Sequence, residues 1–312
     1  MNIGVSDLVR KYGLILALLL GVVILSIISD AFLTFNNLMN VLRQVSINGI
    51  LAVGMTLVIL TAGIDLSIGA LMAVAAVIAA SIVAQNPDAV FPALLAAIAA
   101  SSLLGGVSGV MSTKLNVAPF IATLAMMTIA RGIALIYTNG RPITIQSEAF
   151  KYLGQGYIGP VPVPVVIFAL VTAIFSFILY KTKFGRYIYA VGGNENAAHV
   201  SGIRVHRVKI WVYIINGALA GLAGALLASR ISSGQPNSGL GYELDAIAAV
   251  VIGGTSLFGG RGSMLGTIVG VLIIGVINNG LNLLNVSSYW QQIIKGLIIA
   301  GAVIMDQRTK RG

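Results

Sequence analysis

Long apolar runs, separated by short polar segments, repeat along almost the whole chain. A helix needs about 20 apolar residues to cross the hydrocarbon core of a bilayer, and most runs approach that length. Because backbone polar groups in lipid must be paired within their own segment, each run is predicted to be a helix. The runs cover residues 14–29, 44–62, 66–84, 90–111, 118–138, 163–180, 211–230, 243–258, 264–284 and 289–305. The pattern therefore predicts an all-α polytopic membrane protein with about ten transmembrane helices.

Two of these runs contain interruptions. The run 243–258 is short and carries Asp245 and a Gly-Gly pair, and the run 66–84 follows its predecessor after a very tight turn. Irregular backbone at membrane depth is tolerated only where protein or water surrounds it. Each of these segments is therefore expected to be either a full crossing or a broken, re-entrant one.

The composition excludes several classes of protein. Apolar residues make up 57% of the 312 residues and charged residues only 9%, whereas a soluble domain carries about 25% charged residues. The mean hydropathy of +0.97 agrees with this contrast. An ordinary soluble enzyme, a disordered tail and a nucleic-acid-binding module are therefore excluded, although the net charge is +10.

Basic residues predict the orientation of the chain in the membrane. With a cytoplasmic N-terminus, 13 of the 19 Lys and Arg residues fall in inner segments and four in outer segments. This asymmetry places both termini in the cytoplasm and favours an even number of crossings. The same charges predict contact with anionic membrane lipids. We expect one multi-pass domain of the bacterial inner membrane, residues 1–312, with an uncleaved first helix after Arg10 and Lys11 and a cytoplasmic loop over 181–210.

The usual motifs of catalysis are missing from the sequence. It has no cysteine, two histidines, no GxxxxGK(S/T) phosphate loop and no HExxH motif. No catalytic residue, metal site or cofactor is therefore expected. The ionisable residues placed deep within runs are Arg131, Asp245 and Lys295. Because ion-coupled carriers usually keep ionisable groups deep in their spans, so few of them favour a permease that draws its energy from another subunit.

Glycine recurs at a four-residue spacing in three of the runs. Small residues at this spacing let helix backbones approach closely. The repeats are Gly262, Gly266 and Gly270, then Gly217 and Gly221, then Gly105 and Gly109. Packing within one bundle is favoured over a subunit interface for each repeat.

The largest polar loop assigned to the cytoplasm carries a family signature. Residues 182–203 read TKFGRYIYAVGGNENAAHVSGI, which resembles bacterial ABC-importer permeases of the ribose and simple-sugar group. Asn196, Ala197 and Ala198, followed by Gly202, are similar to the EAA loop of ABC permeases, with Asn at the position that usually holds Glu.

Other stretches resemble the same family in the expected order. Together they extend the resemblance from about residue 32 to 305, and among the subfamilies it is closest to the ribose permeases. The stretches are residues 52–67, 241–251, 253–257 and 278–284.

The resemblance implies the membrane subunit of an ATP-driven importer for a simple sugar, with ribose as the first expectation. Two copies would form the pore, a cytoplasmic ABC ATPase would dock on the loop and hydrolyse ATP, and an external sugar-binding protein would deliver the sugar. The competing interpretation is an ion-coupled secondary carrier or a channel for small polar solutes. The implied ATPase-coupling residues are Gly193, Asn194, Glu195, Asn196, Ala197, Ala198, Gly202 and Ile203.

The residues of this loop suit a short projecting helix. Asn194 can cap its start by accepting a backbone N–H. Ala197 and Ala198 are strong helix formers and small enough to enter a groove on a partner. Gly202 can end the helix in the left-handed conformation. A capped helix between Asn194 and Gly202 is therefore predicted.

Neutral polar side chains gather near the outer end of the run 264–284. A sugar path needs such hydrogen-bonding groups, and the candidates are Asn278, Asn279 and Asn282. Interhelical hydrogen bonding explains them equally well. Asp65 is expected either to cap the helix that begins at Leu66 or to face the partner ATPase.

Overall fold

The computed structural model describes residues 5–311, with the backbone alone at 5–12, 302, 305, 306 and 308–311. The long helices are α1 (Val5–Ile28), α2 (Phe35–Leu60), α3 (Ile68–Gln85), α4 (Val90–Thr113), α5 (Pro119–Thr138), α7 (Val163–Lys181), α10 (Val205–Ile231), α12 (Met264–Leu283) and α13 (Ser288–Arg311). The short helices are α6 (Glu148–Gln155), α8 (Lys183–Gly193), α9 (Glu195–Val200) and α11 (Tyr242–Ile252). The strands form two antiparallel pairs, β1 (Ile143–Thr144) with β4 (Ser233–Gly234) and β2 (Tyr157–Ile158) with β3 (Val161–Pro162).

Seven of the described helices are long and apolar enough to cross a membrane, and the apolar stretch of α1, Gly13–Ile28, is shorter. The seven are α2, α3, α4, α5, α7, α10 and α12. The prediction of an all-α polytopic membrane protein is therefore confirmed.

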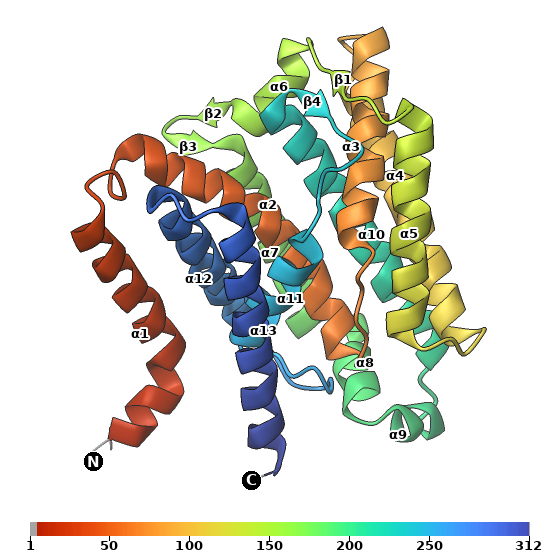
Figure 1. Ribbon diagram of the computed structural model, residues 1–312. Coiled ribbons are helices and arrows are strands. Elements are labelled where there is room, and N and C mark those ends of the chain that lie inside the picture. The colour runs from red at the N-terminus through yellow and green to blue at the C-terminus, as the bar shows by residue number, and fades with distance from the viewer. Residues whose placement is uncertain (1–4, 312) are drawn as a thin grey trace.

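The long helices run between two ends of one bundle (Figure 1). One end carries α8 and α9, and α1 begins and α13 ends there. The opposite end carries α6 and both strand pairs. The two ends are named the α9 end and the α6 end below.

The core of the bundle lies around α10, which packs against α2, α3 and α4. The apolar stretches of α2 and α10 are 83% and 67% buried, whereas those of α4 and α7 are 22% buried. The exposed side chains of α4 and α7 include Phe91, Leu103, Leu170 and Phe177. Large apolar side chains on that face are compatible with lipid and unfavourable in water.

Two helices begin inside the bundle and not at either end (Figure 1). The segment before α3 is extended, and Asp65 and Ser67 within it are fully buried. Helix α11 has 11 residues. At 1.5 Å per residue it spans roughly half of a hydrocarbon core about 30 Å thick. Both interrupted runs of the sequence are therefore broken segments surrounded by protein.

The helix predicted over 243–258 is wrong beyond Ile252. The chain leaves the helix there because Gly254, Gly259 and Gly260 adopt positive φ angles of 85°, 83° and 70°. These are left-handed conformations that interrupt a right-handed helix. Other helices begin earlier than predicted, α2 at Phe35 and α10 at Val205, because polar helical turns extend beyond the apolar runs.

The glycine repeats pack within the chain, as predicted. A Cβ atom at Gly105 would collide with the Tyr213 carbonyl oxygen of α10, and one at Gly217 would collide with the Ser101 carbonyl oxygen of α4. A Cβ atom at Gly270 would collide with the Ala249 carbonyl oxygen of α11. These close approaches explain why α10 can sit so near α4, and α12 so near α11.

Candidate functional site

The short helix α9 projects at the α9 end with the predicted caps. The Asn194 side-chain oxygen accepts a hydrogen bond from the Ala197 N–H at 2.9 Å. Gly202 has a φ of 83°, and the Ile203 N–H donates to the Ala198 carbonyl at 3.0 Å, which closes the C-terminal turn. The predicted capped helix is therefore confirmed in its geometry.

Two residues of α9 differ in exposure from the sequence-based prediction: Ala198 is buried and Val200 is exposed. Ala198 is 4% exposed and packs inward against the core, so only Ala197 of the alanine pair faces outward. Val200 is 87% exposed and was not among the predicted coupling residues. Its apolar side chain in an otherwise polar loop was the available sequence signal. The ion pair between Lys209 of α10 and Glu195 holds α9 against the bundle.

Helix α8 links α9 to the interior of the bundle. A Cβ atom at Gly192 would collide with the Leu60 carbonyl oxygen at the end of α2. That same oxygen accepts a hydrogen bond from the Gly260 N–H at 3.0 Å. Gly192 therefore lies where the end of α2 and the segment before α12 meet.

Two tyrosines strengthen this junction. Tyr189 Oη donates to the Gly262 carbonyl at 2.9 Å, and the Met264 N–H donates to Tyr180 Oη at 2.9 Å. Burial, with a smaller contribution from Tyr180, raises the pKa of Tyr189 to about 12. The Tyr189 phenol therefore keeps its proton and remains a hydrogen-bond donor at neutral pH.

Asp65 organises the broken start of α3. Its Oδ1 accepts hydrogen bonds from the Ser67 N–H at 2.9 Å and the Ser67 hydroxyl at 2.6 Å. Its Oδ2 accepts one from the Asn216 amide of α10 at 2.8 Å. The Asp65 side chain is fully buried. Burial leaves no surface of Asp65 for an ATPase contact. Asp65 does not cap the first turn of α3 either, because the helix begins at Ile68 without a side-chain cap and Asp65 instead bonds Ser67, the residue before it.

The starts of α3 and α11 lie against each other. A Cβ atom at Gly69 would collide with the Gly239 carbonyl oxygen and with the Glu243 carboxylate. Arg131 of α5 donates from one guanidinium nitrogen to the Pro236 and Ser238 carbonyls, both at 2.7 Å. Arg131 thus holds the turns, residues 236–241, that lead into α11.

The predicted path asparagines bridge helices. Asn278 donates to Asp245 Oδ2 at 3.3 Å, and Lys295 of α13 donates to the same oxygen at 2.9 Å. Asn279 and Asn37 of α2 exchange hydrogen bonds of 2.8 and 3.1 Å. The exposed Asn282 accepts from the Gln291 amide at 2.9 Å. The structure thus joins Asn278 to Asp245 and Lys295 and leaves Asn282 apart.

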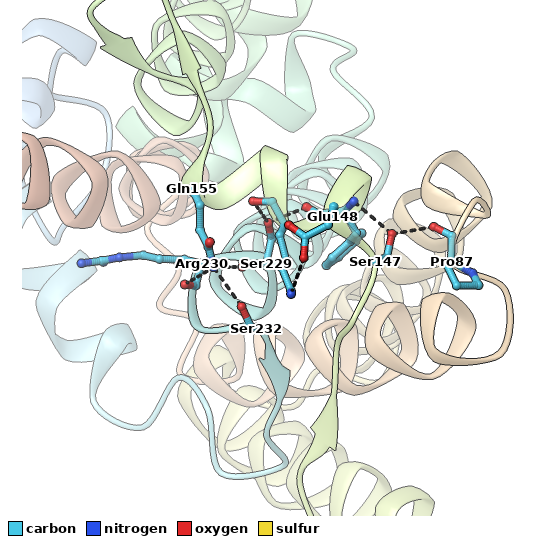
Figure 2. A network of polar contacts seen from close by, with 9 residues as sticks. Pro87, Ser147, Glu148, Gln155, Ser229, Arg230 and Ser232 are labelled. Atoms are coloured by element: carbon cyan, nitrogen blue, oxygen red, sulfur yellow. Dashed lines mark hydrogen bonds and ion pairs between the residues drawn. The ribbon is translucent and has the colours of Figure 1, made fainter.

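The α6 end is closed by a polar network on α10 (Figure 2). Ser229 Oγ donates to the Phe150 carbonyl and accepts from the Gly154 N–H, at 2.6 and 2.7 Å. The Gln155 amide donates to the Ser229 and Arg230 carbonyls at the last turn of α10. Helix α6 therefore caps the C-terminal end of α10. Within the described residues, no group of three or more His, Asp or Glu side chains could hold a metal ion.

Comparison with protein families matches residues 37–303 to the family described as "Branched-chain amino acid transport system / permease component". The chain belongs to this permease family. The permease is 50% identical over 309 residues to the ribose import permease protein RbsC of Bacillus subtilis, which covers 98% of the chain and 96% of the relative.

Other relatives also cover nearly the whole permease. Ribose import permease protein RbsC of Escherichia coli K12 is 51% identical over 300 residues, which are 95% of the chain and 93% of the relative. The D-allose transport system permease protein AlsC of the same organism is 38% identical over 299 residues, or 95% and 91%. No solved structure matches the chain significantly.

Family membership and the seven apolar helices identify a multi-pass protein of the bacterial inner membrane. It is the permease component of an ABC importer and not an enzyme. A permease of this kind works with a partner ATPase and a substrate-binding protein.

Proposed function

We propose that this permease imports a simple sugar, with ribose as its main substrate, in a complex with a separate ABC ATPase and an external binding protein. The observation that carries the proposal is the identity of about half of all positions to ribose import permeases along nearly the whole chain. The identity to the allose permease is lower, at 38%, so ribose is preferred over allose.

We further propose ten membrane crossings in one domain, 1–312, with both termini cytoplasmic. The excess of Lys and Arg in the inner segments supports this orientation. It is also supported by the beginning of α1 and the end of α13 at the α9 end. In this arrangement, α3 and α11 each cross together with the non-helical segment before them. Two copies would pair around the sugar path.

The surface of α9 is the proposed ATPase contact, and it extends from Gly193 to Ile203. Its exposed backbone is held rigid by the Asn194 cap and by the turn at Gly202. Ala197 and the strongly exposed Val200 supply small and apolar contact area. Rigid helices with exposed apolar side chains lose little entropy on docking, which favours binding.

The contacts of α8 suggest how force reaches the sugar path. A shift of α9 would move Gly192 against Leu60 at the end of α2, and Tyr189 against Gly262 before α12. The chain continues from Leu60 into the broken start of α3, and α11 ends just before the Gly260 segment. Displacement of α8 would therefore act on both broken segments together.

The candidate path residues remain Asn278, Asn279 and Asn282. The first two are buried in hydrogen bonds between helices, so they would contact sugar only after helices separate. The alternative function, an ion-coupled carrier or a channel, draws support from the buried Asp245–Lys295 ion pair. Because the two charges neutralise each other and join α11 to α13, packing of these helices explains the pair without ion coupling.

Reconstitution in liposomes tests the proposal. The permease, its ATPase and the binding protein are incorporated, and uptake of radiolabelled ribose is measured with and without ATP. Uptake that requires ATP and all three components is expected, with ribose preferred over allose. Accumulation of ribose by the permease alone, driven by an ion gradient, would favour the carrier instead.

A further inference from the structure

A basic pocket opens beside the coupling region at the α9 end. Its volume is about 330 Å³. It lies between α8, the segment 202–204 and the first turns of α10, and its walls include Tyr187, Arg204, Arg207 and Trp211. The pocket therefore lies beside the turn at Gly202 that ends α9.

The positive charge of this pocket is not balanced by the protein. Among the described residues, neither Arg204 nor Arg207 makes an ion pair or a side-chain hydrogen bond. The acidic residue of α9, Glu195, is already paired with Lys209. Two free guanidinium groups lining one pocket favour an anion that offers several oxygen acceptors, such as a phosphate.

A second cavity, an apolar groove of about 480 Å³, lies between α10 and α4 and shares no lining residue with the basic pocket. On α10 the groove is lined by Ile210 and Ile214, which follow Arg207 at spacings of three and seven residues. Residues at these spacings lie on one side of a helix. On α4 the groove is lined by Leu103, Val107 and Val110 among others. Arg207 of the pocket and Ile210 and Ile214 of the groove thus lie on the same side of α10.

We propose that the pocket and the groove together bind one anionic phospholipid of the inner leaflet. Its phosphate lies between Arg204 and Arg207, and one acyl chain fills the groove between α4 and α10. The inference rests on the cytoplasmic placement of the α9 end in the proposed function. Tyr187 and Trp211, which are 40% and 57% exposed, line the pocket as aromatic residues do at the headgroup level of a membrane.

Phospholipid is favoured over other anions because it alone matches both cavities. A free phosphate ion would satisfy the arginines and leave the groove empty, and an acidic protein segment would not reach a groove at the depth of the acyl chains. A bound lipid would also touch α8 and the segment that ends α9. Its presence would therefore stabilise the coupling region in one position.

Native mass spectrometry tests the site. The full-length permease is mixed with a defined lipid in detergent, the detergent is removed in the spectrometer, and the lipid that stays bound is measured. Phosphatidylglycerol is expected to stay bound and phosphatidylcholine to dissociate. Loss of two surface charges weakens anionic lipid binding by about 30-fold, so Arg204→Gln combined with Arg207→Gln is expected to reduce phosphatidylglycerol retention by that factor. The matched control, Lys183→Gln with Arg186→Gln, removes two exposed charges of α8 that do not line the pocket.

Two further variants separate the lipid from other ligands. Val107→Trp fills the groove without touching the arginines, and it is expected to lower phosphatidylglycerol retention. Arg204→Lys combined with Arg207→Lys keeps both positive charges and is expected to retain most of the phosphatidylglycerol that the wild type binds. Equal retention by the wild type and the Arg-to-Gln variant overturns the site, as does displacement of the lipid by glycerol phosphate. The lipid-binding measurement contains neither sugar nor ATP. Its outcome is therefore independent of the ribose-uptake experiment that tests the proposed function.

Discussion

The two ends of α10 are secured in different ways. At the α6 end, Ser229 of α10 bonds Phe150 and Gly154 of α6, and Gln155 of α6 donates back to the last turn of α10, through buried or half-buried hydrogen bonds (Figure 2). At the α9 end, α9 is joined to α10 by the Glu195–Lys209 pair and a short connection, and most of its side chains are exposed. The α6 end is therefore tied to α10 by more hydrogen bonds, whereas α9 keeps an exposed surface for the proposed ATPase contact.

The largest effect is expected from a substitution in the proposed ATPase contact on α9. Ala197→Arg places a long charged side chain at the centre of the proposed ATPase contact. Central interface positions cost about 2 kcal/mol or more when disrupted, so ATPase binding should weaken by at least about 30-fold and sugar uptake should be lost. Co-purification of the ATPase and ATP-driven uptake measure the two effects.

Gly202→Asp tests the same contact through the backbone. A side chain at a φ of 83° strains the end of α9, and ATPase binding should again be lost. Both variants should still insert in the membrane, and Arg186→Gln on the exposed face of α8 serves as control. Normal ATPase binding by both variants would contradict the assignment of α9.

The second effect separates docking from coupling. Gly192→Ala introduces a methyl group onto the Leu60 carbonyl oxygen, and overpacking of this kind costs about 1–3 kcal/mol. The ATPase should still bind, but uptake per ATP hydrolysed should fall by about tenfold, as a shift of 1.4 kcal/mol implies. Gly193→Ala is the control, because its methyl group would meet nothing within 4 Å. Equal uptake per ATP in the two variants would argue against force transmission through Gly192.

The third effect lies at the rigid end. Ser229→Ala leaves the buried Gly154 N–H and Phe150 carbonyl without their shared partner, which costs about 1–3 kcal/mol of folding stability. The midpoint of thermal unfolding in detergent should fall, whereas ATPase binding should be unchanged. Ser201→Ala removes the exposed hydroxyl of the residue that follows α9 and should leave the midpoint nearly unaltered. A larger fall of the unfolding midpoint in Ser201→Ala than in Ser229→Ala would show that the α9 end, and not the α6 end, contributes more to stability.

The smallest effect concerns the ion pair of α9. Lys209→Gln removes the partner of Glu195, whose side chain is 51% exposed. Exposed ion pairs contribute about 0.2–1 kcal/mol, so ATPase binding should weaken by no more than about fivefold. The difference from the wild type should shrink as salt concentration rises. Lys151→Gln breaks the corresponding pair with Glu148 on α6 and should leave ATPase binding unchanged.

Local features of the site could be predicted from the sequence, because short-range chemistry determines them. The Asn194 cap and the left-handed Gly202 each depend on a few neighbouring residues, and both occur as expected. The interruption before α3 was also signalled by the tight turn before Leu66. The inward orientation of Ala198 could not be predicted, since it depends on how α9 rests on the bundle.

Contacts between distant segments were beyond the reach of sequence patterns. Asn216 meets Asp65 across 151 residues, and Asn37 meets Asn279 across 242. Neither pair shares a periodicity that links the two positions. The choice between path lining and interhelical bonding for the asparagines therefore stayed open until the helices were placed in space.

The meeting of the two unwound segments before α3 and α11 has a mechanical consequence. Bending an intact helix in lipid would expose backbone groups at a cost of several kcal/mol each. In these segments, side chains such as Arg131 already replace helical partners by binding the Pro236 and Ser238 carbonyls. A transport cycle that rotates these segments would therefore break fewer helical hydrogen bonds than one that bends an intact helix.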